Sequence, residues 1–121
     1  MSFREQYFVF KGEIILNQEM DSFFDATAYV YLENVSLIDT AAQLVAKQVI
    51  ADVNHHMGTE NRVKFSLKGE TIDPKARYSI RVHLSLRNDE KIYRGDYIST
   101  ESYPVLTSGY PHQVLVRVQK I

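Results

Sequence analysis

Hydrophobic and polar residues alternate along most of the chain, which is the pattern of half-buried β-strands. The longest alternation runs from Arg77 to Arg87. One face would carry Tyr78, Ile80, Val82, Leu84 and Leu86, and the other would carry Arg77, Ser79, Arg81, His83, Ser85 and Arg87. Because no helix separates these two sets, the segment is predicted to be a strand with Val82 inside and His83 outside.

Six further segments are predicted to be strands. Five of them alternate or are rich in β-forming residues, namely 7–16, 26–34, 62–68, 92–98 and 114–118. The segment 41–53 is ambiguous, because Val45, Val49 and Val53 also fall at helical spacing among good helix formers. A strand is the favoured interpretation there. Turns are expected at 54–59, 88–91 and 108–111, where Gly, Asn, Asp, Ser and Pro gather.

Seven short strands separated by turns, with no alternation of strands and helices, predict two packed sheets. The predicted fold is therefore all-β: a single antiparallel β-sandwich domain over residues 1–121, resembling immunoglobulin and fibronectin domains. Tyr78 follows the connection Ile72-Asp73-Pro74. It is placed to hydrogen-bond back to that connection as a corner tyrosine, the alternative being an ordinary core tyrosine.

Charge and cysteine content narrow the range of partners. Lysine and arginine (14) nearly cancel aspartate and glutamate (15), giving a net charge of −1, so the overall field favours neither nucleic acid nor an anionic membrane. The absence of cysteine excludes disulfides, thiolate chemistry and a lipidated cysteine. With no leader pattern and no run of 18 apolar residues, the sequence as written predicts a cytoplasmic protein without membrane insertion.

No catalytic, metal-binding or cofactor-binding motif is found. The histidines His55, His56, His83 and His112 lack the spacing of zinc ligands, and a solvated loop is the favoured interpretation of the adjacent pair. Neither a Gly-x-Ser-x-Gly elbow nor a phosphate-binding glycine loop occurs. Asp89 and Glu90 are interpreted as solvated turn residues, and Arg94-Gly95-Asp96 as a chance tripeptide. No catalytic residue and no cofactor are therefore predicted.

The outer face of the strand 77–87 is the predicted binding site, carried by Arg77, Arg81, His83 and Arg87. Guanidinium and imidazole groups suit carboxylates or phosphates on a partner. Arg62, Lys64 and Lys68 would extend this positive face if their strand shares the same sheet. Ordinary solvated surface is the favoured alternative, and nucleic acid is only a secondary interpretation of the patch. The predicted partner is a protein, and the oligomeric state is left open.

Several short segments together resemble the YbaY/YscW family, small β-sandwich domains of bacterial lipoproteins that include the pilotins, the lipoprotein chaperones of type III secretion. The segments are Gly12-Glu13-Ile14, Val30-Tyr31-Leu32-Glu33-Asn34-Val35-Ser36, Ala46-Lys47-Gln48-Val49-Ile50, Ile72-Asp73-Pro74 with Tyr78, and Tyr103-Pro104-Val105-Leu106-Thr107. The resemblance implies that 41–53 is a strand. It also implies a non-enzymatic domain that binds another polypeptide.

Pilotins carry an outer-membrane secretin to its site and are typically anchored by a lipidated cysteine. This sequence contains neither that cysteine nor a leader, so the resemblance does not extend to an anchored role. The predicted function is a protein-interaction or chaperone-like module. The alternative is a small-ligand binder or a hydrolase whose site is built by loops.

Overall fold

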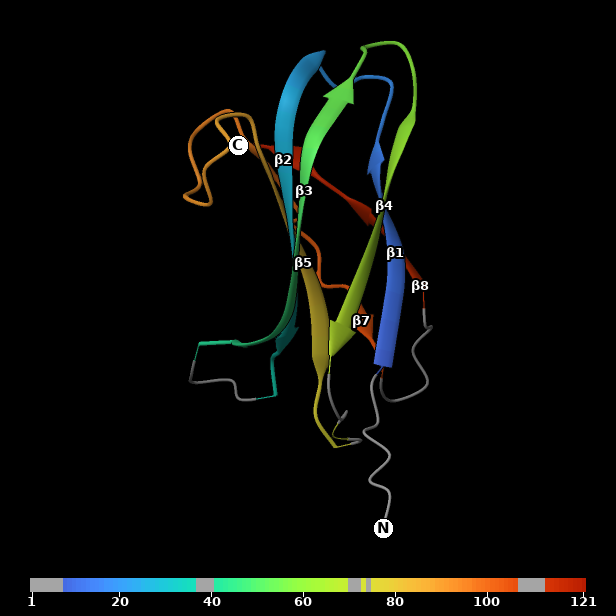
Figure 1. The fold of residues 1–121 in the computed structure, drawn as a ribbon, viewed down its shortest axis with the longest axis vertical. Helices are drawn as coiled ribbons and strands as arrows, with labels where there is room; N and C mark the ends of the chain where they lie inside the picture. Colours follow the sequence, from blue (N-terminus) through green and yellow to red (C-terminus); the bar gives the residue numbers. More distant parts are fainter. Residues whose placement is uncertain (1–7, 37–40, 70–72, 74, 107–112) are drawn as a thin grey trace.

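The computed structural model describes residues 8–36, 41–69, 73, 75–106 and 113–121. Nine strands occur in this part of the chain (Figure 1). They are β1 (Phe8–Leu16), β2 (Phe23–Asn34), β3 (Gln43–His55), β4 (Asn61–Gly69), β5 (Tyr78–Ser85), β6 (Tyr97–Ile98), β7 (Pro104–Val105), β8 (Gln113–Arg117) and β9 (Gln119–Lys120). The count exceeds the seven predicted, because the two-residue strands β7 and β9 are too short to give a periodic signal.

The strands form two sheets that pack as two layers (Figure 1). One sheet has the order β4-β1-β8, and the other has the order β3-β2-β5-β6-β9, with β7 also paired to β5. An all-β sandwich is thus confirmed. The expectation of purely antiparallel pairing is wrong at one place, since β1 and β8 run parallel. The chain passes through β6 and β7 in the other sheet before β8, so it reaches the edge of β1 running in the same direction.

The core lies between the inner faces of β2 and β5 and those of β1 and β4. In the β2–β5 ladder Val30 lies opposite Val82, and both side chains are fully buried. Phe10 on β1 and Phe65 on β4 belong to the same buried cluster. Burying side chains of this size contributes roughly 1.5–3 kcal/mol each. The inward placement of Val82 is confirmed.

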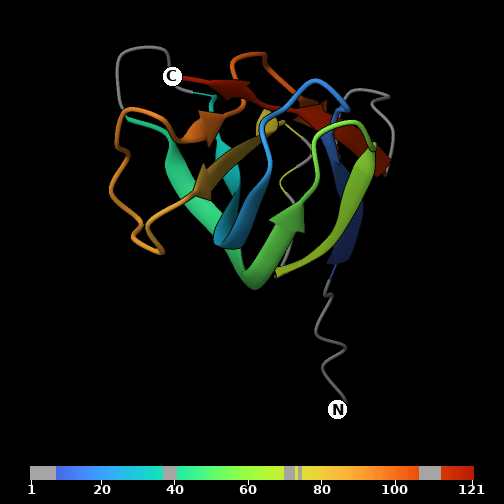
Figure 2. The ribbon, with the colours of Figure 1, turned by 90° about the horizontal axis from the view of Figure 1, so that it is seen from above.

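β3 is a strand throughout, as the family resemblance implied, although its residues favour a helix. It pairs antiparallel with β2 and ends the six-stranded sheet on that side. Sheet pairing outweighs the intrinsic helix preference, which amounts to only a few tenths of a kcal/mol per residue. Seen from above, β3 and β4 lie close together on one side of the sandwich (Figure 2). There the Gln48 side-chain oxygen accepts a hydrogen bond from the Ser66 backbone N–H at 2.7 Å.

The corner before β5 has the predicted tyrosine contact. The Tyr78 hydroxyl oxygen accepts a hydrogen bond from the Asp73 backbone N–H at 3.0 Å, and the tyrosine side chain is buried. This contact fixes the connection to the start of β5. Ile72, Pro74 and the turn predicted at 108–111 lie outside the described residues.

The end of β5 departs from the prediction. The strand stops at Ser85, so Leu86 and Arg87 lie beyond it, and Leu86 is exposed rather than buried. The segment from Leu86 to Asp96 is a loop instead of a tight hairpin followed by a strand. Of the predicted strand 92–98, only Tyr97–Ile98 pairs with β5. A positive φ angle at Asn88 turns the chain away from the strand direction.

Candidate binding surfaces

The four predicted binding residues do not form one row on a single strand. Arg81 and His83 lie on β5, on the face that points away from the core, whereas Arg77 precedes the strand and Arg87 follows it in the loop. Arg77, Arg81 and Arg87 are exposed, but His83 is buried. They are therefore not a single row of solvent-exposed cations, because the strand is shorter than the sequence alternation.

Arg81 is held by groups on the neighbouring strand β2. Its Nε and Nη2 atoms donate to the two carboxylate oxygens of Glu33 at 3.0 and 3.1 Å. The guanidinium lies over the ring of Tyr31, 4.1 Å from the ring centroid, which is a cation–π geometry. The hydrogen bond that Arg81 donates to Glu33 raises the pKa of Arg81 above its ordinary value. The charge of Arg81 is thus already matched within the chain.

Lys47 on β3 completes this aromatic and charged cluster. Its ammonium lies 5.8 and 5.9 Å from the ring centroids of Tyr29 and Tyr31 and forms an ion pair with Glu90 of the β5–β6 loop. Burial, followed by the nearby charge of Glu90, raises the pKa of Tyr31 to about 12. We call Tyr29, Tyr31, Glu33, Lys47, Arg81 and Glu90 the tyrosine face.

His83 does not face solvent, so its predicted exposure is wrong. It is only 1% exposed, because the Tyr29 ring stacks on it with centroids 5.6 Å apart and Asp96 lies against its other edge. Its Nε2 atom is 2.8 Å from Asp96 Oδ2, and Nδ1 has no hydrogen-bond partner among the described residues. A carboxylate opposite Nε2 favours the tautomer with the proton on that nitrogen.

The buried carboxylate of Asp96 forms hydrogen bonds that hold the β5–β6 loop in place. Besides facing His83, its carboxylate accepts backbone hydrogen bonds from Leu86 at 3.1 Å and Tyr93 at 3.0 Å. Burial alone would raise the pKa of this carboxyl, but the hydrogen bonds from His83, Tyr93 and Leu86 outweigh it and lower the pKa. Asp96 is 1% exposed, so the carboxylate of the Arg94-Gly95-Asp96 tripeptide is buried in the loop.

Four other residues of this loop, Arg87, Asp89, Glu90 and Tyr93, also have interaction partners within the chain. The guanidinium of Arg87 lies 4.7 Å from the Tyr93 ring centroid, and the Tyr93 hydroxyl donates to Asp89 at 2.8 Å. Asp89 and Glu90 are exposed, as predicted for turn residues, yet both have partners in the chain. The tyrosine face and this loop form one network of paired charges.

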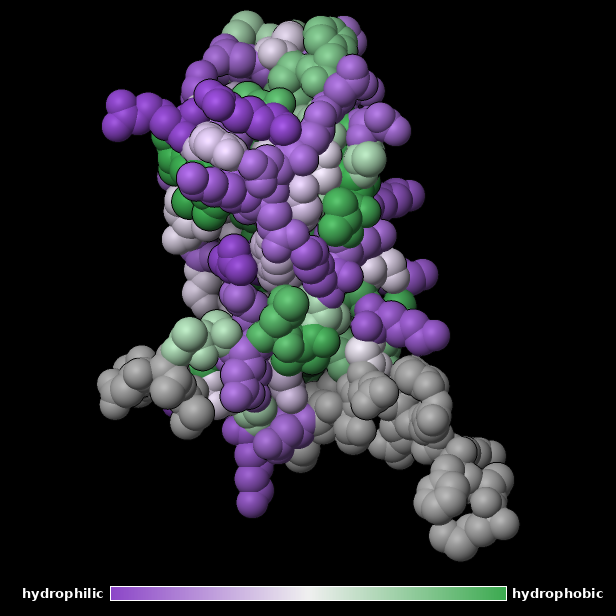
Figure 3. All heavy atoms as spheres, turned by 60° about the vertical axis from the view of Figure 1, so that its left-hand side comes forward, coloured by the Kyte–Doolittle hydropathy of each residue, from purple (hydrophilic) through white to green (hydrophobic). Residues whose placement is uncertain are grey.

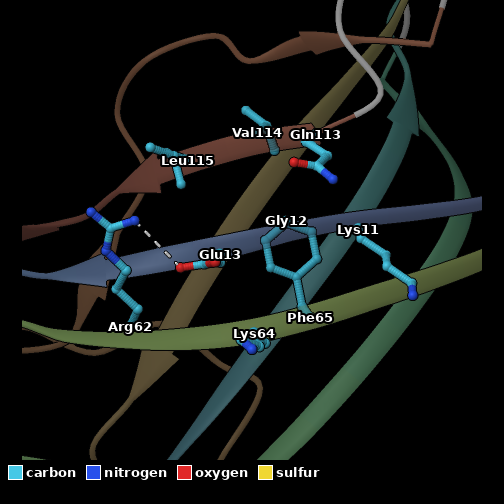
Figure 4. Close-up of a pocket in the computed structure, with 9 residues that line it drawn as sticks. All are labelled: Lys11, Gly12, Glu13, Arg62, Lys64, Phe65, Gln113, Val114 and Leu115. Carbon is cyan, nitrogen blue, oxygen red and sulfur yellow. Dashed lines mark ion pairs between the residues drawn. The ribbon is translucent and has the colours of Figure 1, made fainter.

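A depression of about 630 Å³ crosses the outer face of the other sheet (Figure 4). Its lining residues come from β1, β4 and β8 and are Lys11, Gly12, Glu13, Arg62, Lys64, Phe65, Gln113, Val114 and Leu115. At its centre Gly12 lies opposite Phe65, and a Cβ at this glycine would come within 2.4 Å of the Phe65 ring. The sequence places Arg62 and Lys64 in a candidate positive face, but it does not predict this depression, because the lining residues come together from three strands that are distant in the chain.

The outer face of this sheet is strongly basic. Its three strands carry Lys11, Arg62, Lys64, Lys68 and Arg117, all exposed, and one acidic residue, Glu13. Arg62 lies 3.6 Å from Glu13, whereas Lys11 and Lys64 form no ion pair within the described residues. Arg62, Lys64 and Lys68 belong to a different sheet from Arg81, so the single positive face considered from the sequence does not form.

Exposed apolar side chains gather on the edge strand β3. Leu44 is 56% exposed, Val49 52% and Val45 is also exposed, while only β2 pairs with β3 in the part of the chain that the structure describes. Figure 3 shows this side of the molecule, where hydrophobic patches interrupt a mostly hydrophilic surface. An edge strand that exposes apolar side chains is a ready template for another chain.

The neighbouring histidines His55 and His56 point apart, as expected, but His55 is not solvated. It is fully buried at the end of β3, with Nδ1 2.8 Å from Asn61 Oδ1 and Nε2 3.2 Å from the Met20 carbonyl. Both nitrogens therefore have protein partners. No group of three or more histidine, cysteine, aspartate or glutamate side chains suited to a metal ion occurs among the described residues, and His112 lies outside them.

In the described part of the chain no helix is long and apolar enough to cross a membrane. A search of curated proteins found no match. Among solved structures, an alternative pilotin from the type II secretion system of Vibrio cholerae is similar, with a TM-score of 0.76 and 21% sequence identity over 96% of this chain and 98% of that one. This likeness supports the sandwich fold. Residues 9–118 match the family model of the type III secretion system lipoprotein chaperone YscW, and the chain belongs to that family.

Proposed function

We propose that this protein is a non-enzymatic, chaperone-like module that binds a segment of another polypeptide along the edge strand β3. The observation that carries the proposal is the exposure of Leu44, Val45 and Val49 on a strand of 13 residues whose second edge is not paired by any described strand. An added strand would gain backbone hydrogen bonds from this edge and apolar contacts from these side chains.

The tyrosine face lies beside this edge and supports the same contact. The cationic groups of Lys47 and Arg81 lie over the buried ring of Tyr31. Their side chains are already ordered by these contacts, so binding a partner strand would cost little additional side-chain entropy. Of the residues first predicted for binding, Arg77, Arg81 and Arg87 are exposed. The buried His83 would act only by supporting Tyr29 and the loop.

The identity of the partner follows from the family. The family is that of the type III secretion system lipoprotein chaperone YscW, and the similar solved structure is a pilotin from a type II secretion system. We therefore expect a polypeptide of a secretion system, with an outer-membrane secretin as the first choice.

The hydrolase alternative has little chemical support. His83 and Asp96 form a buried imidazole–carboxylate pair of the kind that assists a nucleophile. Within the described residues, however, no hydroxyl lies within hydrogen-bond distance of His83 Nδ1. A loop-organising role accounts for the pair.

The test is a binding measurement between the purified chain and immobilised segments of a secretin from the same organism. Val49→Asp should weaken binding at least about tenfold, because a carboxylate would be desolvated in the new interface. Val9→Asp is the matched control, since Val9 is a strand residue of similar exposure (55%) on the other sheet. Equal binding by wild type and Val49→Asp would contradict the proposal.

A further inference from the structure

We propose that the basic depression on β1, β4 and β8 is a second binding surface, which takes an acidic, extended segment of a polypeptide partner. It lies on the sheet opposite β3, so it is separate from the contact surface proposed above. The inference rests on the proposed function only in taking the partner to be a polypeptide.

The depression is lined by two lysines whose charge is not paired within the described residues. Lys11 and Lys64 line the depression and have no ion pair among the described residues, in a chain whose net charge is −1. The nearby carboxylates of Glu13 and Glu60 both lie next to Arg62 instead, at 3.6 and 3.9 Å. Free ammonium groups around a depression raise the local concentration of anionic partners.

The spacing of these two lysines matches that of alternate residues in an extended chain. Lys11 lies opposite Ser66 in the β1–β4 ladder and Glu13 lies opposite Lys64, so the two lysines are diagonal neighbours on adjacent strands. Such neighbours are separated by roughly 7–8 Å at their Cα atoms. Side chains two residues apart in an extended chain are about 6.6 Å apart. Acidic residues at alternate positions of a partner segment would therefore match the two lysines.

The other side of the depression supplies a different kind of contact. Gln113 lies beside Lys11 in the parallel ladder and offers an amide, while Leu115 lies beside Glu13 and is 49% exposed. Because side chains at alternate positions of an extended segment face the same side, the methylene groups of one of its acidic side chains would contact Leu115. A volume of about 630 Å³ is large enough to hold a few residues of such a segment.

The probe for the test is a labelled eight-residue peptide that alternates glutamate and serine, compared with the same peptide carrying glutamine in place of glutamate. Fluorescence anisotropy with the complete chain should show at least about tenfold tighter binding of the glutamate peptide, with affinity falling as salt is added. Lys11→Glu/Lys64→Glu should remove at least about nine-tenths of that affinity, and Lys11→Gln/Lys64→Gln should give a smaller loss.

The control variant is Lys75→Glu/Arg94→Glu, which changes the net charge equally at two exposed residues away from this sheet. It should alter affinity by less than about twofold. Equal loss in both charge-reversal variants, or equal binding of the two peptides, would overturn the proposal. Lysine-dependent binding to vesicles containing anionic phosphatidylglycerol, without peptide binding, would also overturn it. Val49→Asp should leave peptide binding intact, which separates this proposal from the β3 contact.

Discussion

The outer faces of the two sheets use their cations in opposite ways. On the six-stranded sheet Arg81 pairs with Glu33, Lys47 pairs with Glu90, and both lie near tyrosine rings. On the three-stranded sheet Lys11 and Lys64 lack an ion pair among the described residues. A count of charges along the strands would treat these faces as equivalent. Only the pairing pattern separates cations that stabilise the fold from cations that are available to a partner.

The two faces also differ in how they are covered. The β5–β6 loop folds over the outer face of β5, where the buried Asp96 accepts hydrogen bonds from three groups. The three-stranded sheet has an open depression instead. Substituting the paired cations of the first face should therefore lower stability, whereas substituting Lys11 or Lys64 on the second face should change the binding of an acidic segment and leave stability nearly unchanged.

The largest effect is expected for Asp96→Ala. Removing this carboxylate leaves the buried Nε2 of His83 and the backbone N–H groups of Leu86 and Tyr93 without an acceptor, which should cost about 3 kcal/mol in the free energy of unfolding. Urea denaturation followed by circular dichroism measures it. Asp89→Ala, at an exposed carboxylate of the same loop, should cost less than about 1 kcal/mol. Similar costs for the two variants would contradict the role assigned to Asp96.

A smaller effect is expected from pH. The pKa of Asp96 is lowered in the folded protein from its ordinary value of 3.8, so its ionised form stabilises the fold above that value. This contribution is lost as pH falls below about 4 and through the lowered pKa. The difference in unfolding free energy between wild type and Asp96→Asn should shrink over that range. A difference that stays constant from pH 6 to pH 3 would rule out this linkage.

The smallest effects should come from the cations themselves, and they compare the two faces directly. Arg81→Ala should cost about 1 kcal/mol, because it removes a bidentate contact with Glu33 and a stacked contact with Tyr31 that are partly screened by solvent. Lys64→Ala should change stability by less than about 0.5 kcal/mol. Thermal unfolding of both variants checks this prediction, which fails if Lys64→Ala proves the more destabilising.

The sequence by itself determined the class of fold and much of the register. Period-two alternation requires opposite faces, so Val82 had to point inward if the segment was a strand at all, and the structure places it in the core. The tyrosine after the connection at Asp73 was also identified from its position alone. Both features depend on near neighbours in the chain, where spacing fixes direction.

The tertiary structure decided what the outward positions do. Alternation places His83 and Lys64 alike on outer faces. A loop ending at Asp96 buries His83, whereas Lys64 forms no ion pair within the described residues. The depression likewise joins Lys11, Lys64 and Leu115 from three strands, one of which pairs in parallel after a long excursion through the other sheet. Whether a polar side chain meets water or protein depends on contacts between residues far apart in sequence. Local periodicity carries no information about such contacts, because it reports only the direction in which each side chain leaves its own strand.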